Sequence, residues 1–168
     1  MAINSVSLHS LEYGNARTYG VAALFIVGNI ALPQLCHLVQ LGGPTLLPIY
    51  FFTLVAAYKY GWKVGLLTAV ASPLVNSLLF GMPAPAVLPA ILIKSVLLAG
   101  AAGFAASRFR TVSLLLLLGV VLFYQVVGSG AEWALTGSLS AALQDFRIGI
   151  PGMLLQILGG YLCVKYLK

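Results

Sequence analysis

The sequence predicts an all-α membrane protein: a bundle of about six transmembrane helices with both ends of the chain in the cytoplasm. Hydrophobic residues make up 61% of its 168 residues and charged residues only 7%, whereas a soluble domain carries about 25% charged residues. Apolar runs of membrane-spanning length, rich in Leu, Ala, Val and Gly, recur along the chain. The period-2 alternation of barrel strands is absent, so helices are expected to satisfy the backbone in lipid.

The first half of a single transmembrane domain, residues 1–168, is expected to hold spans at 17–36, 46–58 and 64–80. Only Asn29 and Pro33 interrupt the first of these. The second is shorter than the roughly 20 residues that cross a bilayer, and a basic, aromatic turn follows it. The third ends before a Gly-Met-Pro-Ala-Pro segment, which breaks a helix because proline lacks an N–H donor.

The second half is expected to hold spans at 86–106, 111–127 and 148–164. The fourth span ends in Ser-Arg-Phe-Arg, where charged residues mark the membrane boundary. The fifth is rich in Leu and Val. A longer polar connection, residues 128–145, leads to the sixth span, which ends in Lys-Tyr-Leu-Lys.

The basic residues predict the orientation of these spans. Only Arg147 falls in an outer connection, and Lys94 lies inside a span. Because Lys and Arg resist translocation, the side with the larger number is expected to be the cytoplasm, with both termini. The inner segments hold Arg17, Lys59, Lys63, Arg108, Arg110, Lys165 and Lys168.

Lys94 is the most informative candidate residue, because it is a charged side chain inside an apolar span. It lies eight residues into the fourth span, roughly 12 Å below its outer end at 1.5 Å per residue. A charge at that depth usually faces a cavity or the interior of the bundle. Lys94 is expected either to bind a carboxylate, a phosphate or an electron-rich ring, or to be a structural lysine that bonds helix-end carbonyls.

Several polar and aromatic side chains share the outer side of the membrane with Lys94. An apolar pocket with a few convergent polar groups suits a small organic ligand; for each single residue, an ordinary role at the membrane interface is the alternative. The expected substrate site consists of Lys94, Asn76, His37, Gln40, Gln125, Glu132 and Trp133.

Small and polar residues on the third span form a stripe at spacings of four, three and four: Gly65, Ala69, Ser72 and Asn76. Small residues at helical spacing let another helix approach closely, so this face is expected to be a packing surface, with Asn76 serving either packing or ligand binding. Gln156 in the sixth span is expected to hydrogen-bond another helix, with contact to a ligand as the alternative.

An enzyme is not expected. The sequence holds no His-Glu-x-x-His or Gly-x-Ser-x-Gly motif, and no Gly-x-x-x-x-Gly-Lys-Ser/Thr loop for ATP. Cys36 and His37 form an isolated pair with no second cluster of metal ligands, so neither a metal site nor any cofactor is expected in this chain.

The chain resembles the S components of energy-coupling factor (ECF) transporters, the substrate-binding membrane subunits of a class of bacterial ABC importers. Six spans in a short chain, a short second span and a longer last outer connection are similar to those proteins. The sequence stretches that carry the resemblance are Gly-Pro-Thr-Leu-Leu-Pro-Ile-Tyr-Phe-Phe (43–52), Tyr-Lys-Tyr-Gly-Trp-Lys-Val-Gly-Leu-Leu (58–67), Asn-Ser-Leu-Leu-Phe-Gly-Met-Pro (76–83) and Leu-Pro-Ala-Ile-Leu-Ile-Lys (88–94).

The resemblance implies a protein of the bacterial inner (plasma) membrane that binds a vitamin or related micronutrient from outside. It would deliver the ligand by toppling in the membrane while docked on a scaffold subunit and two ATPase subunits, which use the ATP. No nucleic acid is implied. The family often contacts the scaffold through Ala-x-x-x-Ala on the first span. Here Ala16 and Gly20 approximate that motif, and Gly65 with Ala69 is a second candidate partner contact.

Two other functions remain open. A stand-alone carrier or channel for small molecules is one, although the shortage of acidic residues within the spans counts against ion coupling. A membrane scaffold protein without transport activity is the other, and in it the small-residue faces would be the whole function.

Overall fold

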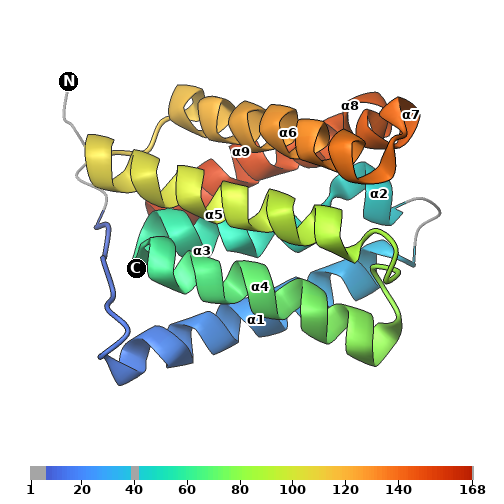
Figure 1. Ribbon diagram of the computed structural model, residues 1–168. Helices are drawn as coiled ribbons and strands as arrows, with labels where there is room; N and C mark the ends of the chain where they lie inside the picture. The colour runs from blue at the N-terminus through green and yellow to red at the C-terminus, as the bar shows by residue number, and fades with distance from the viewer. Residues whose placement is uncertain (1–6, 39–41, 168) are drawn as a thin grey trace.

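A computed structural model describes residues 7–38 and 42–167, and over this part of the chain the regular elements are helices, with no strand (Figure 1). This confirms the all-α prediction. The elements are α1 (Ala16–Cys36), α2 (Gly42–Leu46), the 3-10 helix η1 (Pro48–Tyr50), α3 (Phe51–Tyr60), α4 (Trp62–Phe80), α5 (Leu88–Phe109), α6 (Leu114–Thr136), α7 (Leu139–Ala142), α8 (Gln144–Ile148) and α9 (Ile150–Tyr166).

Four helices, α1, α4, α5 and α6, are long and apolar enough to span a membrane. Their outer faces carry large apolar side chains: Leu24, Leu78 and Leu115 are 70%, 84% and 78% exposed. Such surfaces match a lipid environment, because exposed apolar patches of this kind are rare on soluble monomers. The structure thus indicates a multi-pass membrane protein. That α9 and the α2–α3 segment also cross, to make six spans, stays a prediction.

The expected second span is interrupted in the structure. Residues 46–58 cover the last residue of α2, all of η1 and most of α3, and the break lies at Leu47, whose φ of 47° is in the left-handed region. That conformation costs a leucine about 1–2 kcal/mol. Pro48 then begins η1, since a proline has no N–H to donate into a continuing α-helix.

The expected fifth span is longer than the sequence indicated. We expected it to end at residue 127, but α6 continues to Thr136, so Glu132 and Trp133 lie on a helix rather than in a connection. The glycines around residue 129 do not break the helix, because an Ala-Glu-Trp-Ala-Leu segment that favours helix follows them. The helix ends at Gly137, which has a left-handed φ of 66°.

The centre of the bundle is α3, which packs against α1, α4, α5 and α9 (Figure 1). All of its residues except Phe52 are buried. Gly65 on α4 lies against it so closely that an added Cβ would come within 2.7 Å of the Ala57 Cα. Ala69 is fully buried as well. The packing surface predicted for this stripe is therefore confirmed. Gly65 and Ala69, the second candidate partner contact, are covered by α3 and the core within the chain, so the structure does not favour them as a contact with another subunit.

A buried polar cluster joins α1, α3 and α4. The Asn29 Nδ2 atom donates to Thr53 Oγ1 at 3.0 Å and to Ser72 Oγ at 3.3 Å. Its Oδ1 atom accepts from the Phe52 N–H at 3.1 Å, in the first turn of α3, where backbone N–H groups have no partner within the helix. Asn29 thus supplies the hydrogen bonds that let the short central helix begin inside the bundle.

Replacing Asn29 with leucine is expected to lower the free energy of unfolding by about 1–3 kcal/mol, because buried polar partners then lose their hydrogen bonds. Thermal unfolding in a mild detergent would measure the change. Thr53→Val removes only one bond of the cluster and is expected to have a smaller effect. A larger loss for Thr53→Val than for Asn29→Leu would contradict this account of the cluster.

The two ends of the described chain meet at one end of the bundle, drawn on the left of Figure 1. The His9 N–H donates to the Lys59 carbonyl at 2.8 Å, and the Lys59 Nζ donates to the Val164 carbonyl near the end of α9 at 3.4 Å. The expected inner segments therefore lie together. That this end faces the cytoplasm stays a prediction.

Candidate functional site

A cavity of about 290 Å³ lies at the other end of the bundle. The end of α1, the α2–η1 segment, the connection between α4 and α5, and α7–α8 surround it. Prolines and aliphatic side chains make most of its wall. The polar or aromatic side chains that line it are His37, Tyr50, Lys94, Glu132, Gln144 and Asp145.

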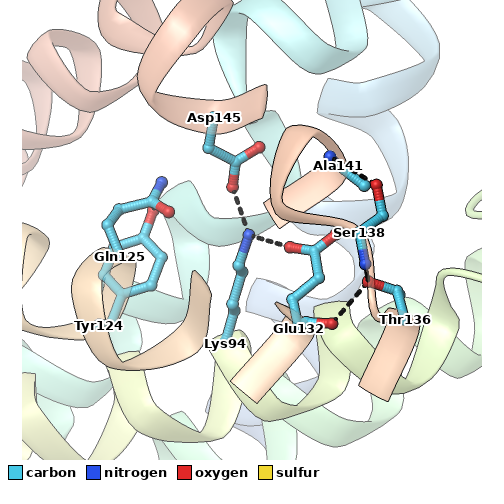
Figure 2. A network of polar contacts seen from close by, with 8 residues as sticks. All are labelled: Lys94, Tyr124, Gln125, Glu132, Thr136, Ser138, Ala141 and Asp145. Carbon is cyan, nitrogen blue, oxygen red and sulfur yellow. Dashed lines mark hydrogen bonds and ion pairs between the residues drawn. The ribbon is translucent and has the colours of Figure 1, made fainter. Parts of the chain in front are cut away.

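Three charged side chains meet in this wall, and we call them the ion triad: Lys94 of α5, Glu132 of α6 and Asp145 of α8. The Lys94 Nζ lies 2.6 Å from Glu132 Oε2 and 2.8 Å from Asp145 Oδ2 (Figure 2). The Lys94 side chain is only 4% exposed, against 13% and 14% for the two carboxylate side chains. The triad thus ties three helices together around a buried ammonium group.

Local sequence places the triad. Glu132 follows Gln125 and Ser129 at spacings of four and three on α6, and both of those side chains are buried, so this face of the helix points into the bundle. Gly128 lies one turn before Glu132, and an added Cβ there would come within 2.5 Å of the Lys94 Cγ. The missing side chain at Gly128 therefore makes room for the stem of Lys94.

The structure pairs Lys94 with acidic side chains. Of the two roles that the sequence leaves open for this lysine, a ligand-binding cation or a structural residue, the contacts favour the structural one, because two carboxylates bond its ammonium group. That Lys94 itself binds a ligand stays a prediction. Counted as formal charges, the one ammonium and two carboxylate groups in the cavity wall sum to −1.

The structure brings three of the predicted site residues to the cavity and leaves the others elsewhere. Lys94, Glu132 and His37 line it. Gln40 lies outside the described residues. The Asn76 side chain packs between α4 and α1, where it donates to the Asn29 carbonyl at 2.9 Å.

Gln125 and Trp133 are also absent from the cavity wall among the described residues. Gln125 is fully buried in the bundle, where its Nε2 donates to the Tyr124 hydroxyl at 3.1 Å. Figure 2 shows Gln125 and Tyr124 beside the triad. Trp133 is 53% exposed. Trp133 directly follows Glu132 on α6, so its side chain points about 100° away from that of Glu132 around the helix axis. The two side chains therefore cannot both face the cavity.

Asp145 and Tyr50 are cavity residues that the sequence reasoning missed. For Asp145 a signal existed, because the chain has only three acidic residues and Glu132 and Asp145 both fall on the same expected side as Lys94. A buried lysine needs a counter-charge, so scarce acids on its side were the natural candidates. No comparable signal singled out Tyr50 among eight tyrosines.

A second buried polar group lies between α6 and α9. The Tyr124 hydroxyl donates to the Gln156 Oε1 at 2.9 Å, which confirms the expectation that Gln156 bonds another helix. Within the described chain, Gln125 Oε1, Gln156 Nε2 and the hydroxyls of Ser95 and Ser129 have no hydrogen-bond partner. The interior beside the triad is therefore more polar than the spans suggest.

The first candidate partner contact, Ala16 with Gly20, is exposed on the surface of the bundle, whereas the second, Gly65 with Ala69, is buried within it. Ala16 and Gly20 are exposed at the start of α1, and nothing comes within 4 Å of a Cβ added at Gly20. This short face is available to another chain.

Comparison of the chain with protein-family models, curated proteins and solved structures found no match. The described residues also hold no group of three His, Cys, Asp or Glu side chains placed to bind a metal ion. The residues of the cavity themselves therefore carry the functional argument.

Proposed function

We propose that this chain is the substrate-capturing membrane subunit of an energy-coupling factor importer in a bacterial plasma membrane. It binds a small organic micronutrient in the cavity and delivers it by reorienting on a scaffold subunit with two ATPase subunits. The observation that carries the proposal is the cavity of about 290 Å³ at one end of the bundle, with apolar walls and a few convergent polar groups. Ligand pockets of about 300 Å³ and more have this character.

Two further features support this assignment. The sequence stretches that resemble S components supply much of the cavity wall, from Gly43 to Tyr50 and again at Met82, Ile91 and Lys94. The exposed face at Ala16 and Gly20 offers a surface on which a scaffold subunit could dock.

Affinity purification of the full chain from its own host in mild detergent, followed by native mass spectrometry, tests the proposal. We expect a retained molecule of vitamin size and co-isolated scaffold and ATPase chains. A protein recovered alone and empty would contradict the importer function.

The ion triad favours one second candidate, a stand-alone carrier coupled to ions. Charged side chains paired inside a membrane bundle often form the ion or proton relays of such carriers, and the triad places two acids beside a buried lysine. Uptake of the retained molecule in a host that lacks all coupling-factor genes distinguishes the two. Under the importer proposal no uptake is expected there; uptake would assign the chain to the carriers.

A further inference from the structure

We infer that the cavity selects a small organic cation, with Glu132 and Asp145 as its recognition groups and Lys94 as the residue that holds them in place. This inference rests on the proposed capture function and names its substrate class. One ammonium and two carboxylate groups leave one negative charge without a counter-ion.

Within residues 7–38 and 42–167, no other lysine or arginine supplies that counter-ion. The chain has nine basic residues, and among those that the structure describes, only Lys94 lines the cavity. Arg147 of α8 lies two residues after Asp145 in the sequence, but its side chain is exposed and is not among the described residues that line the cavity. Because a net charge in a largely apolar wall is costly, a bound cation would complete the balance.

The carboxylate oxygens that do not bond Lys94 also favour a bound cation. Each carboxylate bonds Lys94 through one oxygen, Glu132 Oε2 or Asp145 Oδ2. In the described part of the chain no hydrogen bond reaches the second oxygen of either group, and both side chains keep some exposure while they line the cavity. These oxygens can accept hydrogen bonds from, or pair with, a positively charged ligand.

The rest of the wall indicates that the cation is organic. Tyr50 adds an aromatic ring, and rings attract cations through their electron-rich faces. Proline and aliphatic side chains such as Pro48, Val87 and Ile91 make most of the remaining surface. A hydrated metal ion would leave this apolar surface without a partner, whereas a cation with a hydrocarbon or heteroaromatic body would fill it.

Three pyridine probes of similar size and different charge test the inference: 1-methylnicotinamide (a pyridinium cation), nicotinamide (neutral) and nicotinate (anion). Calorimetry on the full chain in detergent is expected to give at least roughly tenfold tighter binding of the cation than of the anion, because a net −1 wall attracts one and repels the other. Glu132→Gln is expected to reduce the ratio to within about threefold.

Glu12→Gln is the matched control. It makes the same change in formal charge, but Glu12 pairs with Lys63 at the other end of the bundle, so the ratio of affinities is expected to stay as in the wild type. Asp145→Asn provides a second variant of the triad if Glu132→Gln does not elute as a folded protein in size exclusion. The cation preference is expected to fall in that variant as well.

Equal affinities, a preference for nicotinate, an unchanged ratio in both triad variants, or no binding of any probe up to about 10 mM would overturn the inference. The proposed function fails separately. A chain that co-isolates with scaffold and ATPase subunits but prefers the anion would keep the importer function and lose the cation site. A chain that prefers the cation but co-isolates with no partner would keep the cation site and lose the importer function.

Discussion

Lys94→Met is expected to lower the free energy of unfolding by about 3–5 kcal/mol, the usual effect of removing one partner from a buried ion pair. Glu132 and Asp145 both approach the same ammonium group, so its loss leaves two carboxylates close together with no counter-charge between them. The triad is also a direct link between α5, α6 and α8. The variant is therefore expected to loosen the α7–α8 segment over the cavity as well as to unfold at a lower temperature.

A triple variant with Lys94→Met, Glu132→Gln and Asp145→Asn is the control for this result. It keeps the volume of the side chains and removes all three charges, and replacing a whole buried ion network is often neutral for stability. We expect it to recover most of the lost stability when both proteins are unfolded by heat in the same detergent. A single variant as stable as the wild type, or a triple variant no better than the single one, would contradict the structural role of Lys94.

Gly65→Leu is expected to have the next largest effect, a loss of about 3 kcal/mol or more, at the upper end of the range for overpacked cores. The neighbour of the added side chain is the α3 backbone, within 2.7 Å at the Ala57 Cα, and a backbone cannot move aside as the end of a flexible side chain can. Because α3 is the central helix, any shift there disturbs four other helices. The expected result is a chain that elutes as an aggregate in detergent or unfolds well below the wild type.

Gly20→Leu is the matched variant, since the same substitution there meets nothing within 4 Å. It is expected to leave the isolated chain folded and to reduce the recovery of scaffold and ATPase subunits in the affinity purification, because leucine keeps a partner helix from close approach. Tolerance of Gly65→Leu would contradict the packing of α3 against α4. Unchanged partner recovery with Gly20→Leu would remove the start of α1 from the docking surface.

Side-chain pattern and helix geometry made parts of the site predictable. Lys94 stood out because a charge in an apolar run is a local signal that needs no knowledge of the fold. The packing role of the stripe from Gly65 to Asn76 was also readable, because residues at spacings of three and four must share a face of a helix. The structure agrees with both expectations, and places Gly65 and Asn76 in buried positions.

Partners that are distant in sequence were not predictable in the same way. Asp145 lies 51 residues after Lys94 and reaches it only because the fold brings α8 to the same cavity wall as the Lys94 side chain of α5. Trp133 and Glu132 are neighbours in sequence, and only the rotation of α6 about its axis decides that one faces the cavity and the other the outside. That rotation is set by contacts with other helices, which a linear pattern does not contain.

The apolar runs and the scarcity of charge were enough to predict an all-helical membrane protein, because helices are the way for such runs to satisfy their backbone in lipid. The sequence also indicated that a charge lies inside the bundle. The sign of the charge in the cavity wall depends on the packing of the helices, since the net charge of a site is set by which carboxylates reach the lysine. The packing decides as well which small-residue face is covered and which is open. Both depend on contacts between helices that the order of residues along the chain leaves undetermined.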